Sequence, residues 1–318
     1  MKFLCVSPNP AVDKRVLVSK LKPGQIHRVK SARAYAGGKA AHVAMVLRTL
    51  GETPQWIGFT GGETGKDLVF GLKELGIRTQ ACPTQQRTRI NLEIIEDDGL
   101  VTEILEPGGA PSPREVADFQ KRCESAFAHG REQLTVIFSG SLPRGLGEGF
   151  YASLIASAHS FGCRTFLDTS GEPLRLALAA SPHFVKPNRQ EAESLLGYSI
   201  SDLSVGARAL RQLISLGART AAISMGAQGL LWCPGQNGLV HHAYAISLEP
   251  RSTVGCGDAA VAAFAYAAAV GLRVEEALRL ATACAAANCL AESPGAARPA
   301  DIETFRNQTK MEIFISAG

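Results

Sequence analysis

Short apolar runs alternate with longer amphipathic stretches over most of this chain. The apolar runs are four to seven residues long, and the stretches between them carry apolar residues at helical spacing. Strands that are apolar on both faces are buried on both faces, and parallel strands need a long crossover between them. The alternation therefore predicts an α/β fold with a mostly parallel central sheet that helices cover on each side. The predicted strands lie at residues 3–6, 55–59, 134–140, 164–168, 183–188 and 220–226, and the predicted helices at 39–50, 65–75, 113–128, 149–161, 203–216, 257–271 and 274–292.

Other segments of the first third of the chain break this alternation. Residues 87–96 alternate between polar and apolar, turn at 97–99 and then continue as a second strand, which predicts a hairpin. Residues 14–20 and 26–35 show similar polar alternation without crossover helices. Half-polar strands do not fit a sheet that is buried on both faces, so we expect a small second sheet inserted as a lid. A period of two places Arg89, Asn91 and Glu93 on one face of the lid and Ile90, Leu92 and Ile94 on the other.

The length and composition of the chain exclude several classes of protein. With 318 residues, of which 46% are hydrophobic, the chain can bury a large core. Its 33 basic and 29 acidic side chains give a net charge of +4, too small and too evenly mixed for a nucleic-acid-binding surface. The longest apolar stretch, residues 259–270, is half of a membrane span, and Pro8 halts the apolar run that a signal peptide would need. We therefore expect a cytoplasmic protein without nucleic-acid or membrane partners.

The cysteines are spread through the chain and form no Cys-x-x-Cys pair. This spacing predicts small reduced core residues, and it argues against a zinc site or a disulfide framework. An adjacent histidine pair, His241 and His242, is most simply interpreted as part of a surface strand. The eight cysteines are Cys5, Cys82, Cys123, Cys163, Cys233, Cys256, Cys284 and Cys289.

The segment 252–258, Ser-Thr-Val-Gly-Cys-Gly-Asp, carries the strongest chemical signal. Gly255 and Gly257 flank the start of an apolar helix, where free backbone N–H groups and the helix dipole attract an anion. Asp258 places a carboxylate beside that anion site. Taken alone, an aspartate in the first turn is equally well explained as a helix-start residue. The thiol of Cys256 lies near the same helix start, where it could be oxidisable, although an inert buried thiol is the simpler interpretation.

Two further motifs place donors and carboxylates at helix starts. Gly37 and Gly38 open the helix at residues 39–50, with Lys39 and His42 near the same end; an ordinary loop-to-helix junction is the alternative. The second motif is Lys-Pro-Asn-Arg-Gln-Glu at residues 186–191.

In that second motif, Asn188 is a natural N-cap and Glu191 its capping-box partner. The functional alternative has Asn188 and Glu191 holding a hydrated magnesium ion at the carboxyl end of a strand. Residues 224–229, Ser-Met-Gly-Ala-Gln-Gly, form a strand-to-turn element that suits contact with a nucleotide, or equally a simple hairpin turn.

Several familiar motifs are absent from the sequence. It contains no Gly-x-x-x-x-Gly-Lys-Ser/Thr, and no Gly-x-Gly-x-x-Gly follows the first predicted strand. These absences argue against a P-loop nucleotidase and against a dinucleotide-binding reductase. His-Glu-x-x-His and Gly-x-Ser-x-Gly do not occur either, so the sequence shows no sign of a zinc protease or an α/β-hydrolase.

Seven motifs taken together resemble the ribokinase/PfkB family of sugar kinases, and most closely its 1-phosphofructokinase and tagatose-6-phosphate kinase branch. Each motif alone is weak, but their combination and order along the chain are specific. They are Pro-Asn-Pro-Ala-Val-Asp at 8–13, Ala-Gly-Gly-Lys at 36–39, Arg-Thr-Arg-Ile-Asn at 87–91, Ser-Gly-Ser-Leu-Pro at 139–143, Val-Lys-Pro-Asn-Arg-Gln-Glu at 185–191, Ile-Ser-Met-Gly-Ala-Gln-Gly at 223–229 and Ser-Thr-Val-Gly-Cys-Gly-Asp at 252–258.

The resemblance implies a ribokinase-like three-layer α/β sandwich with a small β-sheet lid. We accordingly expect one kinase domain over residues 1–318, with lid strands drawn from about 12–35 and 86–107. The family also implies ATP and Mg²⁺ as cofactors. Its lid often joins two chains, so we expect a homodimer through the lid, where pairing would cover open strand edges.

The resemblance also implies roles for individual residues. Asp258 matches the catalytic base, and Gly255, Cys256 and Gly257 match the anion hole. Two positions near the start of the first helix depart from the family pattern, since Ala40 and His42 stand where the family has glycine and asparagine; Cys256 replaces a common alanine. The substrate-binding set is Asp13, Gly37, Gly38, Lys39, His42, Arg89 and Arg28; the nucleotide-binding set is Lys186, Asn188, Ser224, Gly226 and Gly229; and Glu191 matches the position that holds magnesium through water.

The leading hypothesis is an ATP-dependent kinase of a phosphorylated ketohexose, with fructose 1-phosphate first and tagatose 6-phosphate or fructose 6-phosphate as alternatives. Arg89, with Arg28 in the same lid region, argues for a substrate that already carries a phosphate. A second hypothesis is a kinase of an unphosphorylated sugar or nucleoside. A third is a catalytically silent sensor of sugar phosphate or nucleotide, in which the altered motif around His42 marks lost activity.

Overall fold

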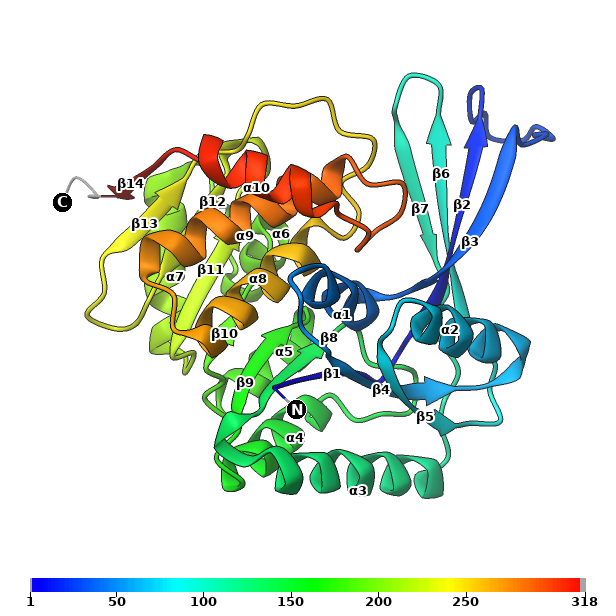
Figure 1. Cartoon of the computed structure of the whole chain (residues 1–318), viewed down its shortest axis with the longest axis horizontal. Coiled ribbons are helices and arrows are strands. Elements are labelled where there is room, and N and C mark those ends of the chain that lie inside the picture. Colours follow the sequence, from blue (N-terminus) through cyan, green and yellow to red (C-terminus); the bar gives the residue numbers. More distant parts are fainter. Residues whose placement is uncertain (1, 315–318) are drawn as a thin grey trace.

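A ten-stranded sheet forms the centre of the molecule in the computed structural model, which describes residues 2–314 (Figure 1). Seven neighbouring strands of this sheet are parallel, namely β5, β4, β1, β8, β9, β10 and β11. The remaining three, β12, β13 and β14, continue the sheet in antiparallel pairing. The order across the sheet is β14 (Met311–Phe314), β13 (Val240–Ala243), β12 (Leu230–Cys233), β11 (Thr220–Ser224), β10 (Phe184–Val185), β9 (Arg164–Asp168), β8 (Thr135–Ser139), β1 (Phe3–Ser7), β4 (Gln55–Thr60) and β5 (Arg78–Pro83).

Helices cover both faces of this sheet and bury two separate apolar clusters. The strands contribute side chains to both clusters, as expected for strands that are apolar on both faces. The predicted α/β class, a three-layer sandwich with a mostly parallel sheet, is confirmed. One face carries α1 (Lys39–Thr49), α2 (Gly62–Glu74), α8 (Cys256–Val270), α9 (Val274–Cys289) and α10 (Pro299–Gln308); the other carries α3 (Pro113–Gly130), α4 (Phe150–Ser160), α5 (Gly171–Leu178), α6 (Arg189–Leu196) and α7 (Leu203–Ser215).

A second sheet of four strands stands apart from the central sheet (Figure 1). We call it the lid sheet, and its order is β3 (Ser31–Gly37), β2 (Ala11–Val18), β6 (Arg89–Glu96) and β7 (Val101–Leu105). Strands β2 and β6 run parallel and form its centre. Leu92 and Ile94 pack with Val16 and Val18 in a small apolar cluster of the lid's own, whereas Glu93 forms polar contacts, as the alternation predicts.

Some predicted boundaries were wrong, for local physical reasons. Of the strand predicted at 183–188 only Phe184–Val185 forms, because Pro187 has no N–H and Asn188 begins α6. Residues 26–30 belong to the loop between β2 and β3. His241 and His242 do lie on a strand, β13, but they are only 7% and 1% exposed, so their surface placement was also wrong. Pairing of β14 against β13 and packing of α9 on it account for that burial.

No helix within residues 2–314 is both long and apolar enough to cross a bilayer.

Candidate active site

The N-termini of α1 and α8 lie close together, because the two helices pack side by side on one face of the sheet. Gly38 and Gly255 are their N-caps, with φ of 84° and 80°. A Cβ at Gly255 would also lie 2.9 Å from the Cβ of Pro294, so both conformation and space favour glycine there. Among the residues that the structure describes, no side chain caps either helix start, which leaves backbone N–H groups available to bind an anion.

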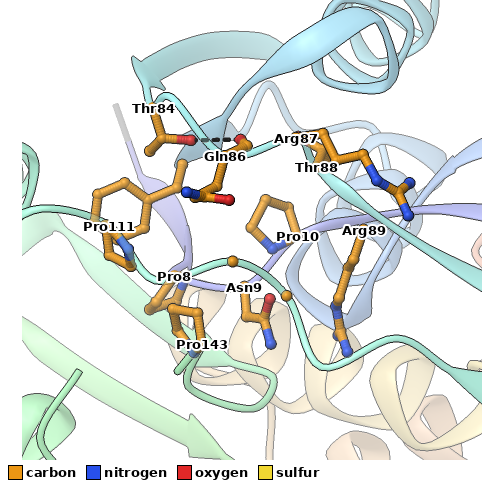
Figure 2. A pocket seen from close by; sticks show the side chains of 13 residues that line it. Pro8, Asn9, Pro10, Thr84, Gln86, Arg87, Thr88, Arg89, Pro111 and Pro143 are labelled. Atoms are coloured by element: carbon orange, nitrogen blue, oxygen red, sulfur yellow. Dashed lines mark hydrogen bonds between the residues drawn. The ribbon is translucent and has the colours of Figure 1, made fainter. Parts of the chain in front are cut away.

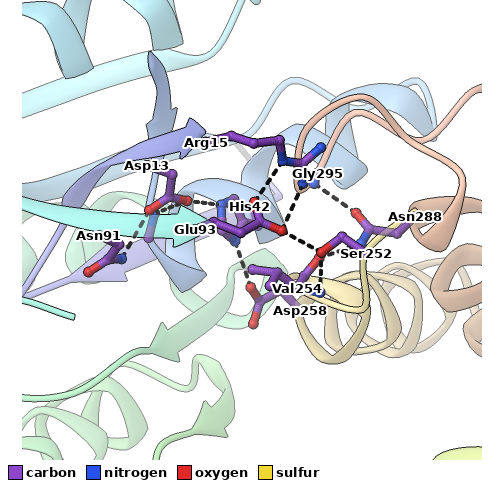
Figure 3. A network of polar contacts seen from close by, with 11 residues as sticks. Asp13, Arg15, His42, Asn91, Glu93, Ser252, Val254, Asp258, Asn288 and Gly295 are labelled. Atoms are coloured by element: carbon purple, nitrogen blue, oxygen red, sulfur yellow. Dashed lines mark hydrogen bonds and ion pairs between the residues drawn. The ribbon is translucent and has the colours of Figure 1, made fainter. Parts of the chain in front are cut away.

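His42 joins two carboxylates at this meeting point (Figure 3). Its Nδ1 lies 2.8 Å from Oδ2 of Asp258, and its Nε2 lies 2.7 Å from Oδ2 of Asp13. All three side chains are buried. Burial opposes the charged form of His42, yet hydrogen bonds and charge from Asp13 and Asp258 raise the pKa of the imidazole to about 10. His42 is therefore an imidazolium at neutral pH that donates to both acids.

Asp13 is held in place by three elements. Its Oδ1 accepts a hydrogen bond of 2.9 Å from Nδ2 of Asn91 on β6, and its Oδ2 accepts one of 3.3 Å from the N–H of Gly38. Gly37 makes this approach possible, since a Cβ there would lie 2.2 Å from Cγ of Asp13. Burial opposes ionisation of Asp13, but the hydrogen bonds from His42, Asn91 and Gly38 lower its pKa. Asp13 is thus a fixed carboxylate at the base of the lid.

A second polar chain connects the lid sheet to the segment before α8 (Figure 3). Arg15 Nε donates to Glu93 Oε2 at 2.7 Å, and Ser252 Oγ donates to Glu93 Oε1 at 2.6 Å. Ser252 Oγ in turn accepts the N–H of Val254 at 3.1 Å, and Arg15 also donates to the carbonyl of Glu292. We call Arg15, Glu93 and Ser252 the lid latch. The alternation in the sequence predicts that Glu93 lies on the same face of the lid as Arg89 and Asn91. No feature of the sequence indicated that Arg15 would bind Glu93.

Two lysines and two acids lie at the carboxyl ends of β9 and β10. Lys39 Nζ lies 3.3 Å from Oδ1 of Asp168 and 3.7 Å from Oε1 of Glu191. Burial opposes the charge on Lys39, but Asp168, Asp258 and Glu191 together raise its pKa. Lys186 is 3% exposed, and its Nζ would lie 3.2 Å from a Cβ on Gly257. The ammonium group of Lys186 therefore points at the start of α8.

Asp168 is a site residue that the sequence analysis missed. It is 1% exposed, and its Oδ2 has no hydrogen-bond partner among the described residues. The available signal was its position, because an acid at the end of a buried parallel strand faces the edge where α/β sheets bind ligands.

Asn188 and Glu191 form the capping box that the sequence offered as one interpretation. Asn188 Oδ1 accepts the N–H of Glu191, and Glu191 Oε2 accepts the N–H of Asn188, both at 2.8 Å. A single parallel bridge joins Asn188 to Ser224, at the end of β11. Gly226 and Gly229 follow in the turn after it. The predicted nucleotide-side residues therefore lie at neighbouring strand ends, and Lys39 joins Glu191, the capping partner of Asn188, to Asp168.

The residues present fit a magnesium ion that arrives with phosphate. No group of three or more His, Cys, Asp or Glu suited to a metal occurs within residues 2–314. Mg²⁺ commonly needs only one or two carboxylates and takes its other ligands from water and phosphate oxygens. The unpartnered Oδ2 of Asp168 and the carboxylate of Glu191 are oxygen donors of that kind.

Arg89 extends the site toward a cleft below the lid. The cleft has a volume of about 470 Å³ and is lined by Arg89, Ser141, Arg144 and Thr169, among others. Arg89 Nη1 donates to the carbonyl of Glu106 at 2.8 Å, and its buried Nε has no partner among the described residues. Arg144 follows the Ser-Gly-Ser-Leu-Pro motif directly, but the sequence analysis did not single it out.

The loops at the rim of this cleft are tied together by Asn9. Its Nδ2 donates to Ser141 Oγ at 3.0 Å and to the carbonyl of Pro107 at 3.2 Å. Asn9, Pro10 and Arg89 also line one small pocket between β1, β2 and β6 (Figure 2). Arg28 is the predicted residue that is not brought to the site, because it lies exposed in the loop beyond the far ends of β2 and β3.

Comparison with known proteins agrees with this geometry. The sequence pattern of the pfkB family carbohydrate kinases matches residues 9–301. A 1-phosphofructokinase of Xanthomonas campestris pv. campestris is 37% identical over 294 residues, 89% of each chain, and one of Rhodobacter capsulatus is 36% identical over 289 residues, again 89% of each. The solved structure of Escherichia coli phosphofructokinase-2 with substrates and products superposes with a TM-score of 0.89 at 25% identity and covers 97% of this chain and 99% of that one.

The two helix starts, the acids around His42 and the buried lysines are thus placed on a fold shared with phosphofructokinases. This chain belongs to the pfkB family of carbohydrate kinases and is a sugar-kinase phosphotransferase of the 1-phosphofructokinase type.

Proposed function

We propose that this enzyme transfers the γ-phosphoryl group of Mg-ATP to a hydroxyl group of fructose 1-phosphate. The observation that carries the proposal is the juxtaposition of Asp258 with the uncapped start of α8, next to a cleft lined by Arg89 and Arg144. The relatives named 1-phosphofructokinase support the same substrate.

Asp258 is the base in this proposal. His42 binds its Oδ2, so Oδ1 is the oxygen that accepts the proton of the sugar hydroxyl. As the proton leaves, the hydroxyl oxygen forms a bond to the γ-phosphorus and the bond from that phosphorus to ADP breaks. General-base help of this kind contributes about 10²–10⁴-fold to the rate. Asp13, fixed by Asn91 and Gly38, is suited to hold a second hydroxyl and so orient the sugar.

The start of α8 stabilises the charge that spreads over the transferring group. Among residues 2–314 no side chain caps the start of α8, and of its first N–H groups those of Gly255 and Gly257 are available, while that of Cys256 donates to the carbonyl of Thr253 at 3.3 Å. The helix dipole adds to the attraction of this helix start for an anion. Lys186 lies beside Gly257 and Lys39 beside Asp168, so two cations flank the path of the phosphates. Glu191 and Asp168 would hold Mg²⁺, which neutralises phosphate charge when bound.

Arg89 and Arg144 bind the phosphate that the substrate already carries. A guanidinium presents several N–H donors in a planar fork that matches phosphate oxygens. The buried Nε of Arg89 is one such donor without a partner among the described residues. Both arginines line the cleft wall, so the substrate phosphate would bind at that wall.

The proposal is tested by ADP release from Mg-ATP with a panel of acceptors, run on the wild type and on Asp258→Asn. The panel is fructose 1-phosphate, fructose 6-phosphate, tagatose 6-phosphate, fructose and ribose. We expect the highest kcat/KM with fructose 1-phosphate and a loss of about 10²–10⁴-fold in kcat for the variant. Turnover of only a neutral sugar would show that the arginine-lined cleft does not bind a substrate phosphate. Tight binding of a sugar phosphate without turnover would instead support the sensor hypothesis.

A further inference from the structure

Two thiols meet immediately behind the start of α8. Cys256 is the first residue of α8 and Cys289 the last residue of α9, and these two helices pack along each other. The Sγ atoms lie 3.1 Å apart although the residues are 33 positions apart in the chain. Both cysteines are partly exposed, whereas the other six are buried. This pair therefore holds the two cysteines that are not buried, and it lies at the uncapped start of α8.

The surroundings of the pair shift the pKa values of the two thiols in opposite directions. The hydrogen bond between Cys256 and Cys289, together with burial, raises the pKa of Cys256, and the same bond lowers the pKa of Cys289. Asn288 Nδ2 donates to Cys256 Sγ at 3.4 Å and to the carbonyl of Val254 at 2.8 Å. Asp258 is the charged group that faces Cys256 from α8 itself. Cys289 is accordingly the thiol with more thiolate character, and Cys256 is its neighbour.

We propose that Cys256 and Cys289 are an oxidation site, a dithiol that hydrogen peroxide converts into a disulfide and whose closure inhibits phosphoryl transfer. The proposal that a disulfide forms rests on the distance between the two sulfur atoms. Its effect on activity rests on the proposed function.

The oxidation takes place in two balanced steps. Cys289 first releases its proton to solvent, and its thiolate then attacks one peroxide oxygen, so that the O–O bond breaks and Cys289 becomes a sulfenic acid. The other oxygen leaves as hydroxide and takes up a proton from solvent, which gives water. The sulfur of Cys256 then attacks Sγ of Cys289, the S–O bond breaks, and the hydroxyl leaves as a second water with the proton of Cys256. Two thiols and one peroxide give one disulfide and two waters, so the sulfurs lose the two electrons that the peroxide gains. A reducing dithiol reverses the bond by exchange.

Closure must draw together two sulfur atoms at the helix start. A disulfide bond is about 2.05 Å long, so the sulfurs have to approach by about 1 Å from their separation of 3.1 Å. Cys256 lies between Gly255 and Gly257 at the anion site, and its own N–H donates to the carbonyl of Thr253 at 3.3 Å. Asn288, next to Cys289, holds the carbonyl of Val254 in the same segment. A misplacement of about 1 Å in a catalytic group can cost about 10²-fold in rate. We therefore expect disulfide closure to lower kcat by about 10-fold to 100-fold.

The test combines peptide mapping with kinetics. The full-length protein is treated with hydrogen peroxide, and non-reducing mass spectrometry searches for a peptide that links Cys256 to Cys289. ADP release is measured before oxidation, after it, and after dithiothreitol. Cys289→Ser removes one partner without touching the anion site. Cys284→Ala, a buried position on the same alanine-rich helix, is the matched control that keeps the pair.

Support for the proposal would be a linked peptide, a fall in kcat that dithiothreitol reverses, and loss of this sensitivity in Cys289→Ser but not in Cys284→Ala. Three results would overturn it: no linked peptide after peroxide, a linked peptide with unchanged turnover, or a Cys289→Ser enzyme as sensitive as the wild type. A reduced protein that turned over no acceptor would refute the proposed kinase reaction, while the peptide map would still decide whether the dithiol site exists.

Discussion

His42 places a positive charge between two buried carboxylates of the site. An imidazolium between Asp13 and Asp258 holds two buried acids that would otherwise repel each other. Breaking a buried charged pair by removing one partner typically costs about 3–5 kcal/mol. The position that departs from the family pattern is therefore expected to contribute to stability as well as to the position of the base.

The contribution of His42 to stability should depend on pH. Its pKa is about 10 in the folded protein and about 6.5 in a model peptide. A raised pKa means that the stabilisation is fully present below pH 6.5 and is lost as the pH rises through 10. We predict that His42→Asn lowers the free energy of unfolding by about 3–5 kcal/mol at pH 6, and that the difference from wild type shrinks toward pH 10.

Urea unfolding of the two proteins at pH 6, 8 and 10 would measure this. His129→Asn, at an exposed position on α3, is the control and should leave the free energy of unfolding within about 0.5 kcal/mol of wild type. A His42→Asn difference that stayed constant between pH 6 and pH 10 would contradict a charged imidazole bridge.

Arg89 should determine how well the enzyme binds a substrate that carries a phosphate. Loss of a hydrogen bond to a charged group costs about 1.5–3 kcal/mol, which corresponds to about 10-fold to 150-fold in affinity. We predict that Arg89→Ala raises the KM for fructose 1-phosphate by that factor and leaves the KM for Mg-ATP unchanged. Arg87→Ala, on the neighbouring exposed arginine, should change neither constant by more than a few-fold. Equal losses for both substrates would instead indicate a general disturbance of the lid.

The sequence could identify site residues only where they belong to a local motif. Asp258, Gly38 and the pair Asn188 and Glu191 stand next to glycines or caps whose backbone role can be read from neighbouring residues. Asp168 belongs to no such motif, and its only signal was its position as an acid at the end of a buried strand. Arg15 acquires its role from Glu93, far away in the chain, and Arg144 from a cleft that distant segments line together; no local pattern encodes either arrangement.

At the level of elements, the lid latch connects the lid sheet to the start of α8. Glu93 on β6 binds Arg15 on β2 and Ser252 before α8, so it ties the lid to the anion site. We predict that Glu93→Gln loosens the lid, lowers kcat/KM for the sugar phosphate about 10-fold or more, and speeds amide hydrogen exchange in β2 and β6. The reason is that Gln removes the charge that pairs with Arg15 while keeping a similar shape.

Hydrogen exchange followed by mass spectrometry would measure the loosening. Lys14 is an exposed residue of β2, so Lys14→Gln, which also removes one charge from the lid sheet, is the control. Unchanged exchange in β2 and β6 of Glu93→Gln would show that the latch does not hold the lid.

The helices and strands that could be predicted from the sequence are those that are buried in the core. Strands apolar on both faces and long amphipathic helices were located within a few residues, because burial imposes their periodicity. Element ends were less predictable, since a local residue such as Pro187 stops a strand that the apolar pattern would extend. The burial of β13 could not be seen at all, because it depends on α9 and β14, which pack against it from elsewhere in the chain.

At the scale of the whole molecule, the lid sheet leaves an apolar surface and two strand edges open. Strands β3 and β7 are the edges of the lid sheet, and open edges of this kind favour pairing with another chain. Large apolar side chains are exposed on the lid strands and their loops, an arrangement that marks association surfaces when such residues are contiguous. They are Leu17, Ile26, Val29, Leu100, Ile104 and Leu105.

We predict that the protein is a homodimer joined through the lid sheets, and that Ile104→Lys converts it to a monomer. A lysine on β7 would place a charge where the partner's apolar surface must pack, and burying an unpaired charge is costly. Light scattering coupled to size-exclusion chromatography at micromolar concentration measures the mass directly. Phe70→Lys introduces the same charge at an exposed apolar position on α2, outside the lid, and should leave the dimer intact. A wild-type mass of one chain would refute the lid interface, and the exposed apolar residues would then need a different partner.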